Sequence, residues 1–93
     1  MKEQDYQKKI VDMLVARGAY VVKVISASKK GVPDILACID GQFIAVEVKT
    51  PTTMGKASVL QEYNLQKIEE AGGIGCIAWN SGRVEEWLDA KGL

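Results

Sequence analysis

The dipeptide Asp40-Gly41, placed between two apolar runs, constrains the fold more than any other feature of this sequence. Asp-Gly between β-rich runs is the strongest short-range signal of a β-hairpin, because both central residues of a type I′ turn need positive φ. If these residues form the turn, pairing counted outward along the strands places Asp34 opposite Glu47. We therefore predict two antiparallel strands over residues 35–39 and 43–48.

The open end of this hairpin is charged, whereas the rest of it is apolar. Lys49 lies two residues after Glu47, so both side chains point to the same face of the strand. Directly opposed carboxylates destabilise a sheet, and a divalent cation such as Mg²⁺, which prefers oxygen ligands, removes that repulsion. The alternative is a salt bridge between Lys49 and one acid on a half-exposed hairpin. The hairpin alone does not decide between the two.

The residue counts exclude several chemistries. The chain has no histidine, which excludes Ser-His-Asp and Cys-His catalysis, histidine-ligated zinc and nucleases with a histidine base. Its two cysteines, Cys38 and Cys76, lie inside apolar runs and cannot complete a zinc site within one chain. We predict that both are buried thiols, which fits a reducing compartment.

The length of 93 residues predicts a single domain, residues 1–93. A chain this short has little core to spare, so we expect a homodimer, with Trp79, Trp87 and Met54 as candidate contacts. No apolar run approaches the roughly 18 residues that span a membrane. The N-terminus also lacks the pattern of a signal peptide. These features predict a cytoplasmic protein with no membrane partner.

Hydrophobic periodicity predicts the remaining elements. In chain order these are a helix, a strand, the hairpin, a helix, a strand and a short helix, over residues 2–17, 20–25, 35–48, 57–71, 74–79 and 84–90. The fourth strand should join the hairpin through a right-handed parallel crossover. Since the hairpin strands are apolar on both faces, we expect a sheet covered on both faces. The predicted fold class is α/β, with a mixed four-stranded sheet flanked by helices.

Two polar residues on the predicted helices have both a structural and a functional explanation. Glu3 lies on the inward-facing stripe of the first helix, where it can serve the helix dipole or point at a site. Ser58 and Gln61 match the S-x-x-Q capping box. On pattern alone, capping is therefore the better explanation for Gln61.

The charges are unevenly distributed along a chain whose formal net charge is zero. The neutral total argues weakly against a nucleic-acid binder, but basic residues outnumber acidic ones between residues 17 and 56. Ser28, Lys29 and Lys30 form a polar, basic loop just before Asp34, and Lys56 follows the hairpin. Such lysines are usually solvated surface charges. The alternative, given their position, is contact with phosphates of a nucleic acid.

Taken together, these features resemble the virus-type replication-repair nuclease (VRR-NUC) family of the PD-(D/E)XK superfamily. Pro33-Asp34 followed by Glu47-Val48-Lys49 looks like the signature of the superfamily. The approach Ser28-Lys29-Lys30-Gly31 is similar to the family's loop before the proline. Gln61 and Glu3 fall where the family carries a helix glutamine and an acid on the first helix. The resemblance covers nearly the whole chain and its helix, strand, hairpin, helix, strand order, which is a restriction-endonuclease-like (αβββαβ) core.

The resemblance implies a metal-dependent phosphodiesterase, similar to dimeric, structure-selective DNA endonucleases such as Holliday junction resolvases. Asp34, Glu47 and the Val48 carbonyl would hold Mg²⁺ or Mn²⁺, which lowers the pKa of a bound water. Lys49 would orient that water or stabilise developing charge. Glu3 would bind a second metal or its water, and Gln61 would position phosphate or water. A bacterial or phage-encoded intracellular protein is expected.

Two alternatives stay open on the same fold. One is an inactive nucleic-acid-binding or dimerisation module, against which the intact set Asp34, Glu47 and Lys49 argues. The other is an RNA-processing nuclease, because nothing in the sequence separates DNA from RNA.

Overall fold

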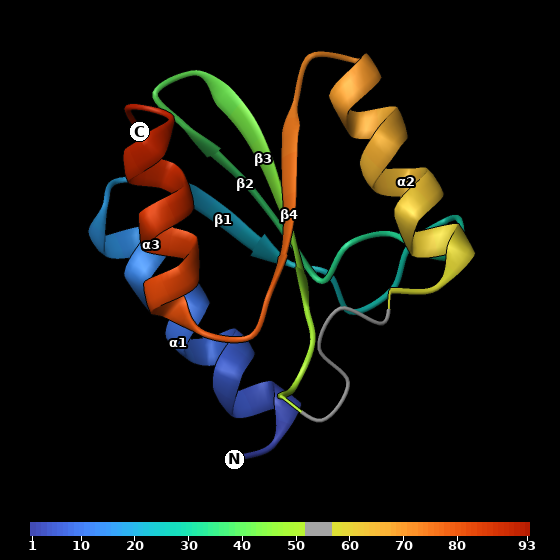
Figure 1. Cartoon of the computed structure of the whole chain (residues 1–93), viewed down its shortest axis with the longest axis horizontal. Helices are drawn as coiled ribbons and strands as arrows, with labels where there is room; N and C mark the ends of the chain where they lie inside the picture. Colours follow the sequence, from blue (N-terminus) through green and yellow to red (C-terminus); the bar gives the residue numbers. More distant parts are fainter. Residues whose placement is uncertain (52–56) are drawn as a thin grey trace.

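The computed structural model describes residues 1–51 and 57–93. Figure 1 shows its elements in chain order: α1 (Glu3–Ala16), β1 (Tyr20–Lys23), β2 (Ile35–Ile39), β3 (Gln42–Val48), α2 (Val59–Glu70), β4 (Ile74–Ala78) and α3 (Ser81–Ala90). The order and type of the elements agree with the sequence prediction. Within the described residues, no helix is both long enough and apolar enough to cross a membrane.

The sheet has the order β1-β2-β3-β4, so β3 is flanked by β2 and β4. β1 and β3 both run antiparallel to β2, whereas β4 runs parallel to β3 after the α2 crossover. The turn residues Asp40 and Gly41 have φ values of 50° and 78°, as a type I′ turn requires. Ile39 pairs with Gln42, so the predicted register of the hairpin is confirmed.

Helices lie on both sides of the sheet, α1 and α3 on one side and α2 on the other (Figure 1). α3 begins three residues earlier than predicted, because the Asn80 side chain caps it. Its Oδ1 accepts a hydrogen bond from the Arg83 N–H at 2.8 Å. Asparagine is among the best N-cap residues. The cap therefore fixes where the chain turns from the end of β4 into the helix.

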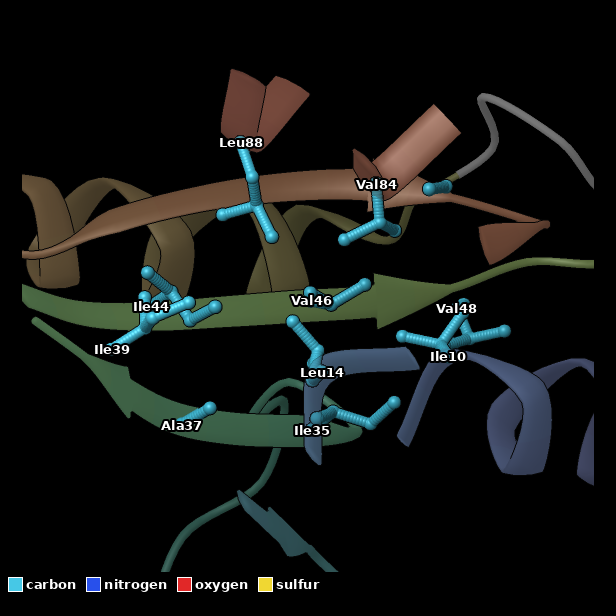
Figure 2. Close-up of a cluster of buried hydrophobic side chains, with 11 residues drawn as sticks. Ile10, Leu14, Ile35, Ala37, Ile39, Ile44, Val46, Val48, Val84 and Leu88 are labelled. Carbon is cyan, nitrogen blue, oxygen red and sulfur yellow. The ribbon is translucent and has the colours of Figure 1, made fainter. Parts of the chain in front are cut away.

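The hydrophobic core fills the layer between the sheet and the α1–α3 pair (Figure 2). Ile10 and Leu14 project from α1, and Val84 and Leu88 project from α3, onto the alternate residues of β2 and β3 that face them. Figure 2 shows Ile10 beside Val48, the last residue of β3. The first turns of α1 are therefore anchored close to the charged end of the hairpin.

The expectation that both sheet faces are covered is wrong for the half formed by β1 and β2. On the face opposite the core, Ala45 on β3 is fully buried, but Tyr20 and Val22 on β1 are 75% and 45% exposed. The helix on this side, α2, connects β3 to β4 and packs on those two strands. Because a crossover helix covers the strands it joins, the apolar residues of β1 and β2 stay open to solvent.

The same geometry corrects the prediction for the cysteines. Cys38 points to the open face and is exposed, so it is not a buried thiol. Cys76 on β4 is partly buried, and burial raises its pKa to about 12. Of the candidate dimer contacts, Trp87 packs against the core and Trp79 stacks on the Arg83 guanidinium at 4.5 Å. Met54 lies outside the described residues.

Candidate active site

The predicted carboxylate pair comes together at the open end of the hairpin. The pairing of Ile35 with Val46 is the last in the ladder, and Asp34 and Glu47 follow directly on the two strands. Asp34 is held by hydrogen bonds on both its side chain and its main chain. Its Oδ2 accepts from the Val48 N–H at 2.8 Å, and its carbonyl accepts from the Val24 N–H at 2.8 Å. The position of this carboxylate is therefore set by β3 and by the end of β1.

Glu47 is buried, with only 2% of its surface exposed. Its Oε2 accepts a hydrogen bond from the Gln61 Nε2 at 3.0 Å and lies 3.6 Å from the Lys49 Nζ. Its Oε1 is buried and accepts no hydrogen bond from the residues that the structure describes. Buried polar atoms are almost always satisfied, so this oxygen marks a place where another group belongs.

The electrostatics of the pair favour a proton or a cation. Burial is the largest of the causes that together raise the pKa of Glu47 to about 8; the nearby charge of Asp34 adds to the shift and Lys49 opposes it. With this raised pKa, Glu47 holds a proton near neutral pH when no cation is present. A bound cation would displace that proton, because carboxylate ligands bind metals in the ionised form.

Gln61 caps α2 and also contacts the carboxylate pair, through opposite ends of one amide. Its Oε1 accepts from the Ser58 N–H at 2.9 Å, and its own N–H donates to the Ser58 Oγ at 3.2 Å, which completes the capping box of α2. Its Nε2 donates to Glu47. The capping bond fixes the amide, so that the start of α2 orients a carboxylate on β3.

Glu3 is held less closely to the carboxylate pair than Gln61 and Lys49 are. It is exposed and begins α1, and Asp5 rather than Glu3 accepts the hydrogen bond of the Lys2 N–H, at 2.8 Å. Its charge nevertheless contributes slightly to raising the pKa of Glu47, so Glu3 lies within electrostatic range of the pair. Its assignment as a metal ligand remains a prediction.

The donor set fits a hard divalent cation. It consists of oxygen atoms, with a buried and unsatisfied Oε1 on Glu47 beside Asp34, and Mg²⁺ commonly takes one or two carboxylates and keeps several waters. Among residues 1–51 and 57–93, no group of three or more His, Cys, Asp or Glu side chains could hold a metal. The ion would therefore rest on two carboxylates, with the Val48 carbonyl as the predicted third ligand.

The candidate nucleic-acid contacts lie beside this pair. We call residues 28–31 the basic loop; it joins β1 to β2, and Ser28, Lys29 and Lys30 are exposed on it. Lys56, the other predicted contact, lies outside the described residues. Gly31 ends the loop three residues before Asp34, so the loop leads directly into the site.

Sequence reasoning missed two buried polar residues near the site. Gln7 on α1 is 7% exposed, one turn before Ile10, and Asn64 on α2 is 6% exposed, one turn after Gln61. The Asn64 Nδ2 donates to the Lys30 carbonyl at 3.1 Å, across 34 positions of the sequence. A polar residue at a position where a helix stripe should be apolar was the available signal for both.

Comparisons with known proteins bear on the family and the fold of this chain. A family model described as archaeal Holliday junction resolvase matches residues 1–89. A solved structure described as a VRR_NUC domain superposes with a TM-score of 0.76 at 22% sequence identity, covering 94% of each chain. No curated protein matches the chain. These matches confirm the nuclease resemblance and the restriction-endonuclease-like α/β fold inferred from the sequence.

Proposed function

Because this chain belongs to the archaeal Holliday junction resolvase family, we propose that it is a Mg²⁺- or Mn²⁺-dependent endonuclease that cleaves branched DNA, such as four-way junctions. The observation that carries the proposal is the buried Glu47 beside the partly buried Asp34, with one Glu47 oxygen left without a hydrogen bond among the described residues. In a metal site this oxygen would face the cation.

Each residue of the site has a separate task in this reaction. Asp34 and Glu47 would hold the cation, which supplies Lewis-acid activation of the phosphate and of a water when bound. The Val48 N–H orients Asp34, and Gln61 orients Glu47. Both carboxylates are thus fixed before substrate arrives, which is how preorganised sites avoid reorganisation during the reaction.

Lys49 is placed to act on the reacting groups rather than on the cation. Its side chain is 16% exposed, and its Nζ lies 3.6 Å from the Glu47 Oε2. An ammonium at this position can donate hydrogen bonds to the attacking water or to the phosphate oxygen on which charge develops.

Branched DNA is the substrate class that the family name specifies, and the chain offers a basic loop for phosphate contacts. We further propose that the working form is a homodimer. A four-way junction has two-fold symmetry, and a closed dimer of identical chains has the same symmetry. Two sites related in this way would cut two strands of one junction.

The test is cleavage of a four-way junction, a linear duplex of the same sequence and a structured RNA, with Mg²⁺, Mn²⁺ or EDTA. We expect cleavage of the junction with either cation and none in EDTA. Glu47→Gln serves as the inactive control for contaminating nucleases. Full activity in EDTA would contradict the metal assignment. Cleavage of RNA alone would mean that the substrate is RNA and not DNA. DNA binding without cleavage would favour the inactive nucleic-acid-binding module.

The dimer is tested separately by sedimentation at the assay concentration. If the protein is a monomer and still makes both cuts in one junction as often as expected for a dimer, the dimer is refuted and the cleavage proposal stays intact.

A further inference from the structure

We propose that Asn64 is a positioning residue that docks the basic loop on α2, so that the DNA contacts of the loop are fixed relative to the carboxylate pair. The inference rests on the proposed function and adds a residue outside the set Asp34, Glu47 and Lys49. It concerns how substrate is placed, and not how the bond is broken.

The first observation is the bonding of the Asn64 side chain. Its Nδ2 donates to the Lys30 carbonyl at 3.1 Å and to the Leu60 carbonyl at 2.9 Å. An asparagine amide has two N–H donors, and both are used here. One bond fixes the side chain to its own helix, and the other reaches the loop. The amide is therefore oriented by α2 before it binds the loop.

The second observation is the contact at Gly31. This glycine has a φ of 81°, and a Cβ built on it would lie 2.7 Å from the Leu60 Cγ and 2.8 Å from the Asn64 Nδ2. No side chain fits there without displacing the helix, and the positive φ also favours glycine. The backbone of the loop is thus in direct contact with the first turns of α2, which Figure 1 shows beside it.

These contacts join two functional parts of the molecule to one helix. Gln61 and Asn64 are three residues apart on α2, so they lie on neighbouring positions of the same face. Gln61 holds Glu47, and Asn64 holds Lys30. The lysines of the loop are therefore placed relative to Glu47 through a rigid element. If the loop were released, the carboxylates would remain in place and the lysines would lose their fixed position.

Docking itself is tested without any nuclease activity, by limited trypsin digestion of Asn64→Ala. We expect cutting after Lys29 and Lys30 to become roughly fivefold faster, the factor that one hydrogen bond of ordinary strength represents. Cutting after Lys91, far along the chain, should not change. Gln42→Ala is the matched control, because the Gln42 Nε2 also donates to two main-chain carbonyls, those of Phe43 and Gly72, both at 3.1 Å.

The functional half is tested by junction binding in Ca²⁺ and by steady-state cleavage in Mg²⁺. For Asn64→Ala we expect Kd and KM to rise roughly fivefold, while kcat stays within about twofold. Gln42→Ala should alter neither. A fall in kcat with KM unchanged would mean that Asn64 acts through Gln61, and faster tryptic cutting with unchanged Kd would mean that the loop does not place DNA. Either result overturns the proposal.

Asn64→Asp guards against a variant that merely fails to fold. It keeps the size of the side chain and replaces the two donors with oxygens that face two carbonyls. We expect the same defects as for Asn64→Ala, and wild-type values in both assays would overturn the proposal. If the wild-type protein cleaves nothing, the proposed function fails, and the tryptic rates and the Kd values still decide the role of Asn64.

Discussion

At its turn, the β2–β3 hairpin follows the local rules of backbone geometry, whereas at its open end two acidic groups lie beside each other and one of them, Glu47, is buried. Asp40 and Gly41 adopt the positive φ values that a two-residue turn needs. Asp34 and Glu47 repel each other when both are ionised, and burial is the largest of the causes that together raise the pKa of Glu47 to about 8. The turn end of these two strands therefore stabilises the fold, and the open end destabilises it.

The difference separates what folds the chain from what the chain does. Changes at the turn should reduce stability and leave the cleavage rate unchanged. Changes at the open end should reduce the cleavage rate and leave stability unchanged or higher. Such a trade is expected where a site holds groups that a stable core would exclude. Four changes test this division, from the largest expected effect to the smallest.

Glu47→Gln should abolish cleavage and leave the metal-free protein as stable as wild type, or more stable by up to about 1 kcal/mol. The substitution keeps the shape of the side chain and removes the group that repels Asp34 when it ionises. Mg²⁺ at ten times its dissociation constant should add about 1.4 kcal/mol to the wild type and little to the variant. Thermal melts of both proteins in EDTA and in Mg²⁺ measure this. A variant that is clearly less stable in EDTA and still gains the full metal increment would show Glu47 to be scaffold.

Lys49→Met should remove detectable cleavage, a loss of at least roughly 10²–10³-fold, and should leave metal binding largely intact. The ammonium is assigned to water and phosphate, and the thioether keeps most of the packing volume. Kinetics give the first quantity, and the Mg²⁺-dependent rise in melting temperature gives the second. Loss of Mg²⁺ affinity as severe as that of Glu47→Gln would mean that the roles are wrong.

The metal-free protein should lose stability as the pH rises from about 4.5 to about 8. The folded state holds a proton on Glu47 that the unfolded chain, with a pKa of 4.5, gives up in this range. The stabilisation is therefore complete below the unfolded pKa and is lost as the pH passes through the folded pKa. Melting temperatures in EDTA at pH 5.5 and pH 8.5 measure it. Glu47→Gln, which cannot ionise, is the reference, and a wild-type slope no steeper than its slope would contradict the raised pKa.

Gly41→Ala tests the other end of the hairpin and should cost about 1–2 kcal/mol of stability, because an L-residue is strained at positive φ. A Cβ there meets no atom within 4 Å, so the cost is conformational. kcat should not change at a temperature where the variant is folded. Gly82→Ala, on α3 and without positive φ, is the control and should not destabilise. A fall in kcat for Gly41→Ala would mean that the two ends are coupled.

The hairpin and its carboxylate pair could be predicted because they depend on neighbours in sequence. A two-residue turn at Asp40-Gly41 fixes the register, and the register alone brings Asp34 opposite Glu47. The resemblance then extended the site to Gln61. Pattern could not decide between capping and site roles for Gln61, because one amide both caps α2 and donates a hydrogen bond to Glu47.

What could not be predicted depends on contacts between distant segments. From sequence alone, Asn64 is only a polar residue in a helix. Its role depends on the contact with the basic loop, 34 positions away, which the sequence does not predict. The apolar alternation of β2 shows that both faces can be covered, but not that α2 lies over β3 and β4. For that reason Cys38 was expected to be buried and is exposed.

The shortness of the Asp40-Gly41 turn also affects how fast the chain can fold. Hairpins close in roughly 1–10 μs, well before segments that are distant in sequence meet. We therefore expect the charged end of β2 and β3 to form before α2 and β4 dock. Repulsion between the two acids should then slow an early step, so that a proton or a cation that relieves it should speed folding more than it slows unfolding, as refolding and unfolding rates in EDTA and in Mg²⁺ would measure.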